Sequence, residues 1–158
     1  MIFVTVGTQL AFDRFIAAVD DWCGANPTVP VFAQVGPTKL TIRHMKHEKF
    51  ISQEEANKLF LDASLIVTHA GMGSVLTGLK YRKPIVIVPR KAALGEHRND
   101  HQLATAKWLA ERSGISVVWD ESEIAATLDN YKLLQKGAEI PDHASPELLN
   151  RLKEFILE

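Results

Sequence analysis

Short apolar runs alternate along the chain with longer segments in which apolar residues recur every three or four positions. A short apolar run is typical of a buried strand, and the wider spacing is typical of a helix with one buried face. Strands that lack polar alternation indicate a parallel sheet covered by helices on both faces. The predicted strands are Ile2–Val6, Val31–Val35, Leu65–Thr68, Ile85–Val88 and Ile115–Val118.

Helix signals flank these strands. Ser52 with Glu55 is a capping-box signature, and Gly24 is expected to end the first helix. Residues 39–51 could hold one or two short strands, and residues 132–143 are expected to form a loop. The predicted helices are Phe12–Cys23, one beginning after Ser52, Gly73–Tyr81, His101–Arg112, Glu121–Leu128 and one beginning at Pro146. The apolar stripe of the last one is Leu148, Leu149, Leu152, Phe155 and Ile156.

The composition fits one soluble α/β domain over residues 1–158, with a mostly parallel Rossmann-like sheet. The net charge of −1 gives no sign of a nucleic-acid-binding protein. No apolar run approaches the roughly 20 residues of a transmembrane helix, and the N-terminus lacks the basic region of a signal peptide. The single cysteine, Cys23, excludes an internal disulfide and fits a reducing compartment; we interpret it as a core residue.

Glycines follow two predicted strands where the chain turns into a helix. Gly7 follows the first strand, and the segment His69-Ala70-Gly71-Met72-Gly73-Ser74 follows the third. Glycine lets a ligand approach the backbone closely, and a helix N-terminus attracts anions such as phosphate. Because the carboxyl ends of parallel strands meet at one edge, these turns predict a phosphate cradle. A plain structural turn at Gly7, and a serine that only caps its helix, stay open as alternatives.

Polar side chains fill residues 96–102, the loop after the fourth predicted strand, at the same edge of the sheet. Asp, Asn, His and Gln are the types that bond the neighbouring hydroxyls of a sugar. A solvated charged loop is the ordinary alternative, and Arg90 and Arg98 could be solvated or could pair with a uronate carboxylate. Zinc is a further alternative because His97 and His101 are four residues apart, although the loop argues against one helix carrying both.

These segments resemble the C-terminal domain of family 28 glycosyltransferases, the C-terminal half of the GT-B fold. The resemblance rests on the glycine segment 69–74, on Lys83-Pro84-Ile-Val-Ile-Val-Pro89-Arg90 and on Gly95-Glu-His-Arg-Asn-Asp-His-Gln102, and it covers nearly the whole chain. MurG is a two-domain member of the family. The chain is more similar to the PssE-type subunits of bacterial exopolysaccharide synthesis and to the small donor-binding subunit of the eukaryotic dolichol-linked N-acetylglucosamine transferase.

The resemblance implies a UDP-sugar donor. It places the diphosphate at the two glycine turns, the uracil beside Phe50 and Ile51, and the donor sugar near His101 and Gln102. One position departs from the family, because Thr77 stands where members often carry a glutamate that holds the ribose hydroxyls. The predicted donor-binding residues are Gly7, Thr8, Phe50, Ile51, His69, Gly71, Met72, Gly73, Ser74, Glu96, Asn99, Asp100, His101 and Gln102.

The resemblance also implies transfer of a hexose-type sugar to a lipid-linked acceptor in exopolysaccharide or capsule synthesis, without a metal or other cofactor. A GT-B enzyme needs two Rossmann-like domains, and 158 residues allow one. The expected partner is therefore a membrane-associated subunit of the PssD type that carries the acceptor site and the general base. No catalytic residue is assigned on this chain, and His69 and His97 are the weak candidates for that base.

The expected location is the cytoplasm, with recruitment to the inner face of the membrane by the partner. Without that partner, the chain could self-associate into a homodimer. Two alternatives remain open. One is a regulatory module that binds a nucleotide sugar without transferring it. The other is an enzyme resembling a UDP-sugar epimerase, which would also need two domains.

Overall fold

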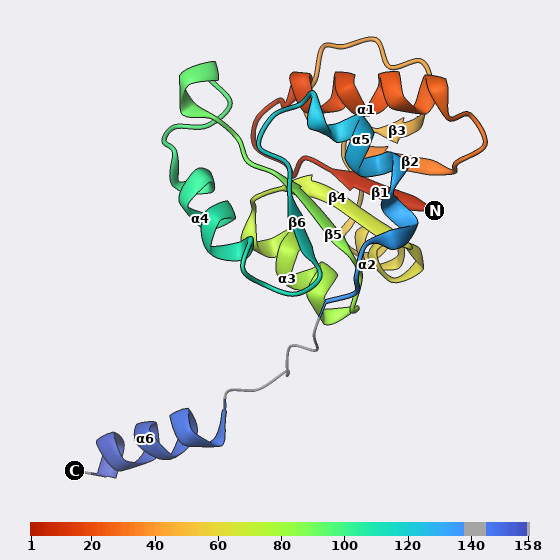
Figure 1. Cartoon of the computed structure of the whole chain (residues 1–158). Helices are drawn as coiled ribbons and strands as arrows, with labels where there is room; N and C mark the ends of the chain where they lie inside the picture. The colour runs from red at the N-terminus through yellow and green to blue at the C-terminus, as the bar shows by residue number, and fades with distance from the viewer. Residues whose placement is uncertain (138–144, 158) are drawn as a thin grey trace.

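Six parallel strands form a single sheet at the centre of the molecule (Figure 1). The protein is described here from a computed structural model, which covers residues 1–137 and 145–157. The strand order is β3-β2-β1-β4-β5-β6, which confirms the predicted Rossmann-like sheet. The strands are β1 (Ile2–Thr5), β2 (Val31–Gln34), β3 (Lys46–Glu48), β4 (Leu65–His69), β5 (Ile85–Val88) and β6 (Ile115–Val117).

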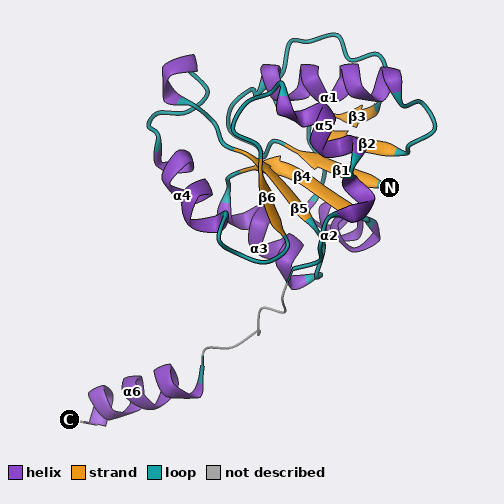
Figure 2. Ribbon diagram, viewed as in Figure 1, coloured by secondary structure: helices purple, strands orange, loops and turns teal. Residues whose placement is uncertain are grey.

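Helices cover both faces of the sheet (Figure 2). Helices α1 and α5 pack on one face, where Phe15 and Ile124 are fully buried. Helices α2, α3 and α4 pack on the other, where Phe3 of β1 meets Phe60 of α2 edge-on at 5.1 Å between ring centroids. The helices are α1 (Asp13–Ala25), α2 (Gln53–Asp62), α3 (Met72–Lys80), α4 (His101–Leu109), α5 (Glu123–Asp129) and α6 (Pro146–Leu157), with two 3-10 turns, η1 (Ala92–Leu94) and η2 (Tyr131–Leu133).

The direction in which successive strands are added to the sheet reverses after β3: β2 and β3 lie on one side of β1, and β4, β5 and β6 lie on the other. Strand β1 pairs with β2 on one side and with β4 on the other, so that Ile2 lies between Val31 and Leu65. The loops that follow β1 and β4 therefore leave the sheet next to each other, one turning back over each face. A crevice at this crossover is where open parallel sheets bind ligands.

Several helix boundaries differ from the prediction by one to three residues, among them the ends of α1 and α4. Gly24 does not end α1 but lies inside it, and the helix stops at Ala25, where the backbone N–H of Asn26 donates to Cys23. Helix α4 ends at Leu109, three residues before the predicted Arg112. Cys23 is 3% exposed, which confirms its place in the core, and burial raises the pKa of its thiol to about 11, with a smaller contribution from Asp20.

Three predicted helix starts are confirmed, one of them that of α4 at His101. Ser52 is the N-cap of α2 and accepts a 3.1 Å hydrogen bond from the backbone N–H of Glu55. Helix α6 begins at Pro146. The ambiguous segment 39–51 holds one short strand, β3, whose residues are all exposed. Of the predicted loop 132–143, residues 138–143 lie outside the described residues.

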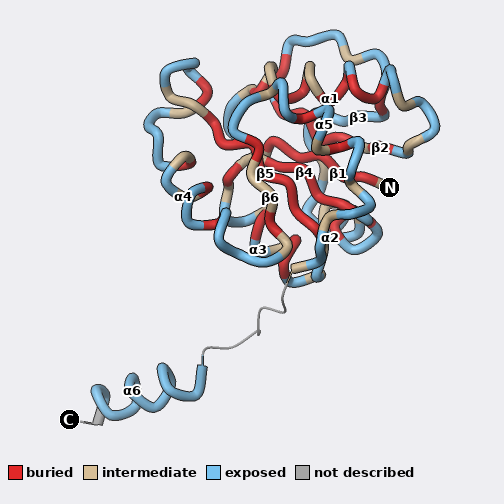
Figure 3. Tube along the Cα trace, in the orientation of Figure 1, coloured by how far each residue is buried: buried red, intermediate tan, exposed pale blue. Residues whose placement is uncertain are grey.

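Helix α6 keeps its apolar stripe in solvent (Figure 3). The exposed fraction of these side chains ranges from 41% at Leu149 to 78% at Phe155. Within residues 1–137 and 145–157, none of the helices combines the length and the apolar character that crossing a membrane requires.

Candidate functional site

Two adjoining cavities open where the strands end, beside the crossover between β1 and β4. The first lobe has a volume of about 340 Å³ and the second about 290 Å³. They share a wall made of Gly7 and Thr8 from the turn after β1 and of Gly73 and Ser74 from the start of α3. The first lobe is also lined by Val6, Gln9, Leu10, His69, Gly71, Arg90, His97, His101 and Gln102. The second is also lined by Phe3, Thr5, Gln34, Ile51, Ser52, Gln53, Ala56, Phe60 and Thr77.

The side chain of Gln34, the last residue of β2, holds the turn after β1. Its side-chain amide donates to the carbonyls of Gly7 and Lys49, both at 2.9 Å. The hydroxyl of Thr5 donates to the carbonyl oxygen of the same side chain at 2.6 Å. Gly7 itself has φ +74°, a left-handed conformation that glycine adopts without strain. The buried side chain of Gln34 therefore holds the turn after β1 in place. The sequence pattern did not identify this residue.

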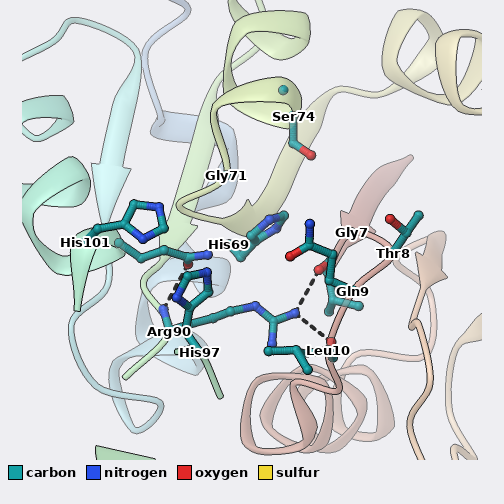
Figure 4. Close-up of a pocket in the computed structure, with 13 residues that line it drawn as sticks. Gly7, Thr8, Gln9, Leu10, His69, Gly71, Ser74, Arg90, His97 and His101 are labelled. Carbon is teal, nitrogen blue, oxygen red and sulfur yellow. Dashed lines mark hydrogen bonds between the residues drawn. The ribbon is translucent and has the colours of Figure 1, made fainter. Parts of the chain in front are cut away.

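His69 ends β4 and lies between the two glycine turns (Figure 4). A Cβ at Gly7 would lie 2.9 Å from the Cε1 atom of its ring, and a Cβ at Gly71 would clash with its Nε2 atom. Burial and then the charge of Arg90 lower the pKa of His69 to about 4. The imidazole is therefore neutral at physiological pH and offers one donor and one acceptor rather than a positive charge.

Helix α3 directs its N-terminus at the shared wall. Gly71 is its N-cap residue, and Gly73 and Ser74 lie in its first turn. The backbone N–H groups of a first helical turn have no partner within the helix, and the helix dipole adds positive potential there. Thr77, one turn later, lines the second lobe and donates its hydroxyl to the carbonyl of Gly73 at 2.8 Å.

Arg90, the second residue after β5, is 3% exposed and spans the floor of the first lobe (Figure 4). Its guanidinium donates to the carbonyls of Val6 and Leu10, both at 2.8 Å, and stacks on the ring of Phe12 at 4.5 Å. Burial lowers its pKa to about 10, so the side chain remains charged at neutral pH. The alternative of a solvated arginine is wrong here, because backbone carbonyls replace water around the guanidinium.

The acidic residues of the polar loop hold the loop together. Glu96 accepts from Arg14 at 2.6 and 3.1 Å and from the backbone N–H of Lys91 at 2.9 Å, and it borders a separate hollow beside α1. Asp100 accepts from the backbone N–H of Ala92 at 2.8 Å. Neither carboxylate lines the lobes, because both are used to fold the loop between β5 and α4.

The imidazoles of this loop do reach the first lobe. The rings of His97 and His101 meet edge-on at 4.6 Å between centroids, and Asn99 bonds the Nδ1 atom of His101 through its amide oxygen at 2.7 Å. Gln102 accepts from the backbone N–H of Arg90 at 3.1 Å. Among residues 1–137 and 145–157, no three His, Cys, Asp or Glu side chains form a group that could hold a metal ion.

The structure brings together most, but not all, of the predicted site residues. Those that line a lobe are Gly7, Thr8, Ile51, His69, Gly71, Gly73, Ser74, His101 and Gln102. Those that line neither lobe are Phe50, Met72, Glu96, Asn99 and Asp100, and a ligand contact at these positions stays a prediction. The lining residue Gln34 was missed, and Arg90 was considered only as a partner for a uronate carboxylate; the one available signal was a polar residue ending an apolar strand, at Gln34.

The family model described as "Glycosyltransferase family 28 C-terminal domain" matches residues 1–146. The chain belongs to this family. Among curated relatives, the family 28 domain is similar to "UDP-N-acetylglucosamine transferase subunit ALG13" of mouse and of human, each at 30% identity over 68% of the chain. The chain spans about a tenth of the length of these relatives, since the match covers 10% of each.

Solved structures share the fold of this family 28 domain. An NMR solution structure of ALG13 has a TM-score of 0.62 at 18% identity, and the match covers 99% of this chain and 96% of that one. The MurG crystal structure from Acinetobacter baumannii has a TM-score of 0.57 at 22% identity, over 84% of this chain and 42% of that one. The sheet and helices therefore match the C-terminal half of GT-B glycosyltransferases, as predicted.

Proposed function

We propose that residues 1–158 form one donor-binding domain, and that its two lobes bind a UDP-sugar and activate it for sugar transfer. The observation that carries the proposal is the wall of Gly7, Thr8, Gly73 and Ser74 between the lobes, at the N-terminus of α3. The diphosphate is the part of a nucleotide sugar that lies between base and sugar. Backbone N–H groups and the helix dipole favour its charge without a metal.

The nucleoside and the sugar of the donor then each occupy one lobe. The second lobe suits uracil and ribose because it combines the apolar side chains of Ile51 and Phe60 with the hydroxyl of Thr77. The first lobe suits the sugar because His101 and Gln102 carry groups that bond sugar hydroxyls. The names of the similar curated proteins, UDP-N-acetylglucosamine transferase subunits, support a UDP-linked hexose-type donor.

In the proposed reaction, an acceptor hydroxyl oxygen attacks the anomeric carbon of the sugar. The bond from that carbon to the diphosphate oxygen breaks, UDP leaves with the electron pair, and the hydroxyl proton passes to a general base. Donors aimed at the leaving oxygen stabilise its growing charge. His69 is a weak general base because its pKa is about 4.

We propose that a partner subunit of the PssD type supplies that base, the acceptor site and the membrane attachment. The acceptor would be a lipid-linked sugar of exopolysaccharide or capsule synthesis. The names of the similar curated proteins support a partner, because both are called subunits. The exposed stripe of α6 adds an apolar surface that a partner could cover.

Calorimetric titration with UDP tests donor binding. The wild-type chain should bind UDP in a saturable way, and Ile51→Arg should weaken binding about tenfold or more because the new side chain fills the second lobe. Leu61→Arg is the matched control, since Leu61 is 55% exposed and lies outside both lobes. Absence of UDP binding by the wild-type chain would overturn the proposal.

Transfer from a labelled UDP-sugar tests the partner. The isolated chain should transfer no sugar to a lipid-linked acceptor until the acceptor subunit is added. Turnover by the chain alone would contradict the need for a partner. UDP binding without turnover in the complete complex would instead favour the regulatory module.

A further inference from the structure

Arg90 joins two segments of the first lobe that are distant in sequence. From one guanidinium nitrogen, Nη2, it donates to Val6 and Leu10, both at 2.8 Å. From the other, Nη1, it donates to Ala11 at 2.7 Å and to Glu96 at 3.2 Å. All four acceptors are backbone carbonyls, three in the turn after β1 and one in the polar loop after β5. A single side chain therefore holds both segments.

The backbone of Arg90 adds a fifth link. Its N–H donates to the side chain of Gln102, at the start of α4 and in the lining of the first lobe. Arg14 holds the polar loop too, but through the carboxylate of Glu96, the carboxylate of Glu121 and the carbonyl of Pro89. None of those acceptors belongs to the turn after β1, so this second arginine does not span the lobe.

We infer that Arg90 is a positioning residue for donor binding, whose guanidinium fixes the distance between the turn 6–11 and the loop 95–102. The inference rests on the proposed function, because that distance is the width of the lobe assigned to the sugar and its phosphate. An arginine suits the task, since its planar fork holds five N–H donors and four carbonyls must be satisfied away from water. Lysine carries the same charge but only three donors on one nitrogen.

The test is Arg90→Lys, assayed by calorimetry with UDP at a temperature where circular dichroism shows a folded chain. We expect the dissociation constant to rise by roughly tenfold or more, because small displacements of positioning groups are costly to a bound ligand. Arg112→Lys is the matched control: Arg112 also stacks on an aromatic ring, that of Trp108 at 4.5 Å, but lines neither lobe. That variant should bind UDP as tightly as the wild type.

A second readout separates positioning from a general loss of stability. In NMR spectra of the folded Arg90→Lys variant, the backbone amide signals of Gly7, Thr8 and His97 should shift, while those of β1 and β4 remain in place. Wild-type affinity in the folded variant would overturn the inference and leave the proposed function intact. No UDP binding by the wild-type chain would overturn the proposed function instead.

If Arg90→Lys does not fold, the Phe12→Leu variant tests the inference in its place. Phe12 is fully buried and supports the guanidinium at 4.5 Å without lining either lobe, so leucine loosens Arg90 while keeping the core apolar. A rise of about threefold or more in the UDP dissociation constant supports the inference. A smaller change overturns it.

Discussion

The ring of His69 fills the space between the two glycine turns, so the neighbouring glycines differ in what they tolerate. A Cβ at Gly71 would clash with the Nε2 atom of His69, whereas a Cβ at Gly73 meets no atom within 4 Å. Gly73 lies in the first turn of α3 and borders both lobes. A methyl group at Gly71 therefore strains the fold, whereas a methyl group at Gly73 reaches only into the lobes.

We predict that Gly71→Ala lowers the free energy of unfolding by about 1–3 kcal/mol, because the imidazole or the backbone must move. Gly73→Ala should leave it unchanged or raise it by up to ~1 kcal/mol, since alanine favours the helix. The same Gly73→Ala change should weaken UDP binding by ~10-fold or more, because its methyl group enters the space of the ligand. Urea unfolding and calorimetry of both variants check this pair, and full UDP affinity in Gly73→Ala would contradict it.

The depressed pKa of His69 makes stability depend on pH. In the folded chain the pKa is about 4, below the ordinary value of 6.5, so the unfolded chain takes up the proton first as the pH falls. The stability linked to this site is present above pH 6.5 and is lost as the pH falls toward 4.

Between about pH 7.5 and pH 5, the wild type should therefore lose about 2 kcal/mol more unfolding free energy than His69→Gln. Urea unfolding at both pH values measures the difference. His47→Gln, at an exposed position on β3, serves as the control and should keep the acid sensitivity of the wild type. Equal acid sensitivity in wild type and His69→Gln would show that the histidine is not held neutral by the fold.

At the scale of elements, the strands that could be predicted were those whose side chains are buried. Strands β1, β4 and β5 are apolar on both faces, so the hydrophobic pattern predicts their bounds to within a residue or two. Strand β3 could not be placed because Lys46, His47 and Glu48 are all exposed, and it joins the sheet through its backbone. An edge strand of this kind leaves no hydrophobic pattern to recognise.

The site residues also divide into those that could be predicted from the sequence and those that could not. The glycine turns could be predicted because glycine allows the left-handed backbone of Gly7 and the close approach of the His69 ring to Gly71. Arg90 and Gln34 could not, because their partners are backbone carbonyls, which every residue carries and no sequence pattern marks. The carboxylates of Glu96 and Asp100 were expected at the ligand, and the structure shows Glu96 bonded to Arg14 of α1 and to the backbone of Lys91, and Asp100 to the backbone of Ala92.

Helix α6 leaves the side chains of its apolar stripe 41–78% exposed. We predict that removing residues 145–158 leaves the thermal midpoint unchanged within about 2 °C, because buried apolar area, not helix formation, provides stability. Differential scanning calorimetry checks this. Light scattering of both chains shows whether the stripe also supports a homodimer, in which case only the full chain would have twice the monomer mass. A large drop in the midpoint would mean that α6 packs on the domain.

For the molecule as a whole, the order of the strands determines where its chemistry lies. Because β1 is paired with β2 and β4, the turn that follows it faces α3 across the crossover. The residues of the shared wall are 66 positions apart in sequence, from Gly7 to Gly73. They are neighbours only because the parallel sheet ends both strands at one edge.

The shared wall has an evolutionary consequence. Beyond it, the two lobes have no lining residue in common: one draws on the ends of β2 and α2, and the other on the loop between β5 and α4. Mutations at lining residues that do not hold the shared wall can therefore remodel one lobe while the other keeps its shape. Under the proposed function, relatives with this arrangement can evolve to bind a different sugar in the first lobe and keep the nucleotide site of the second lobe unchanged.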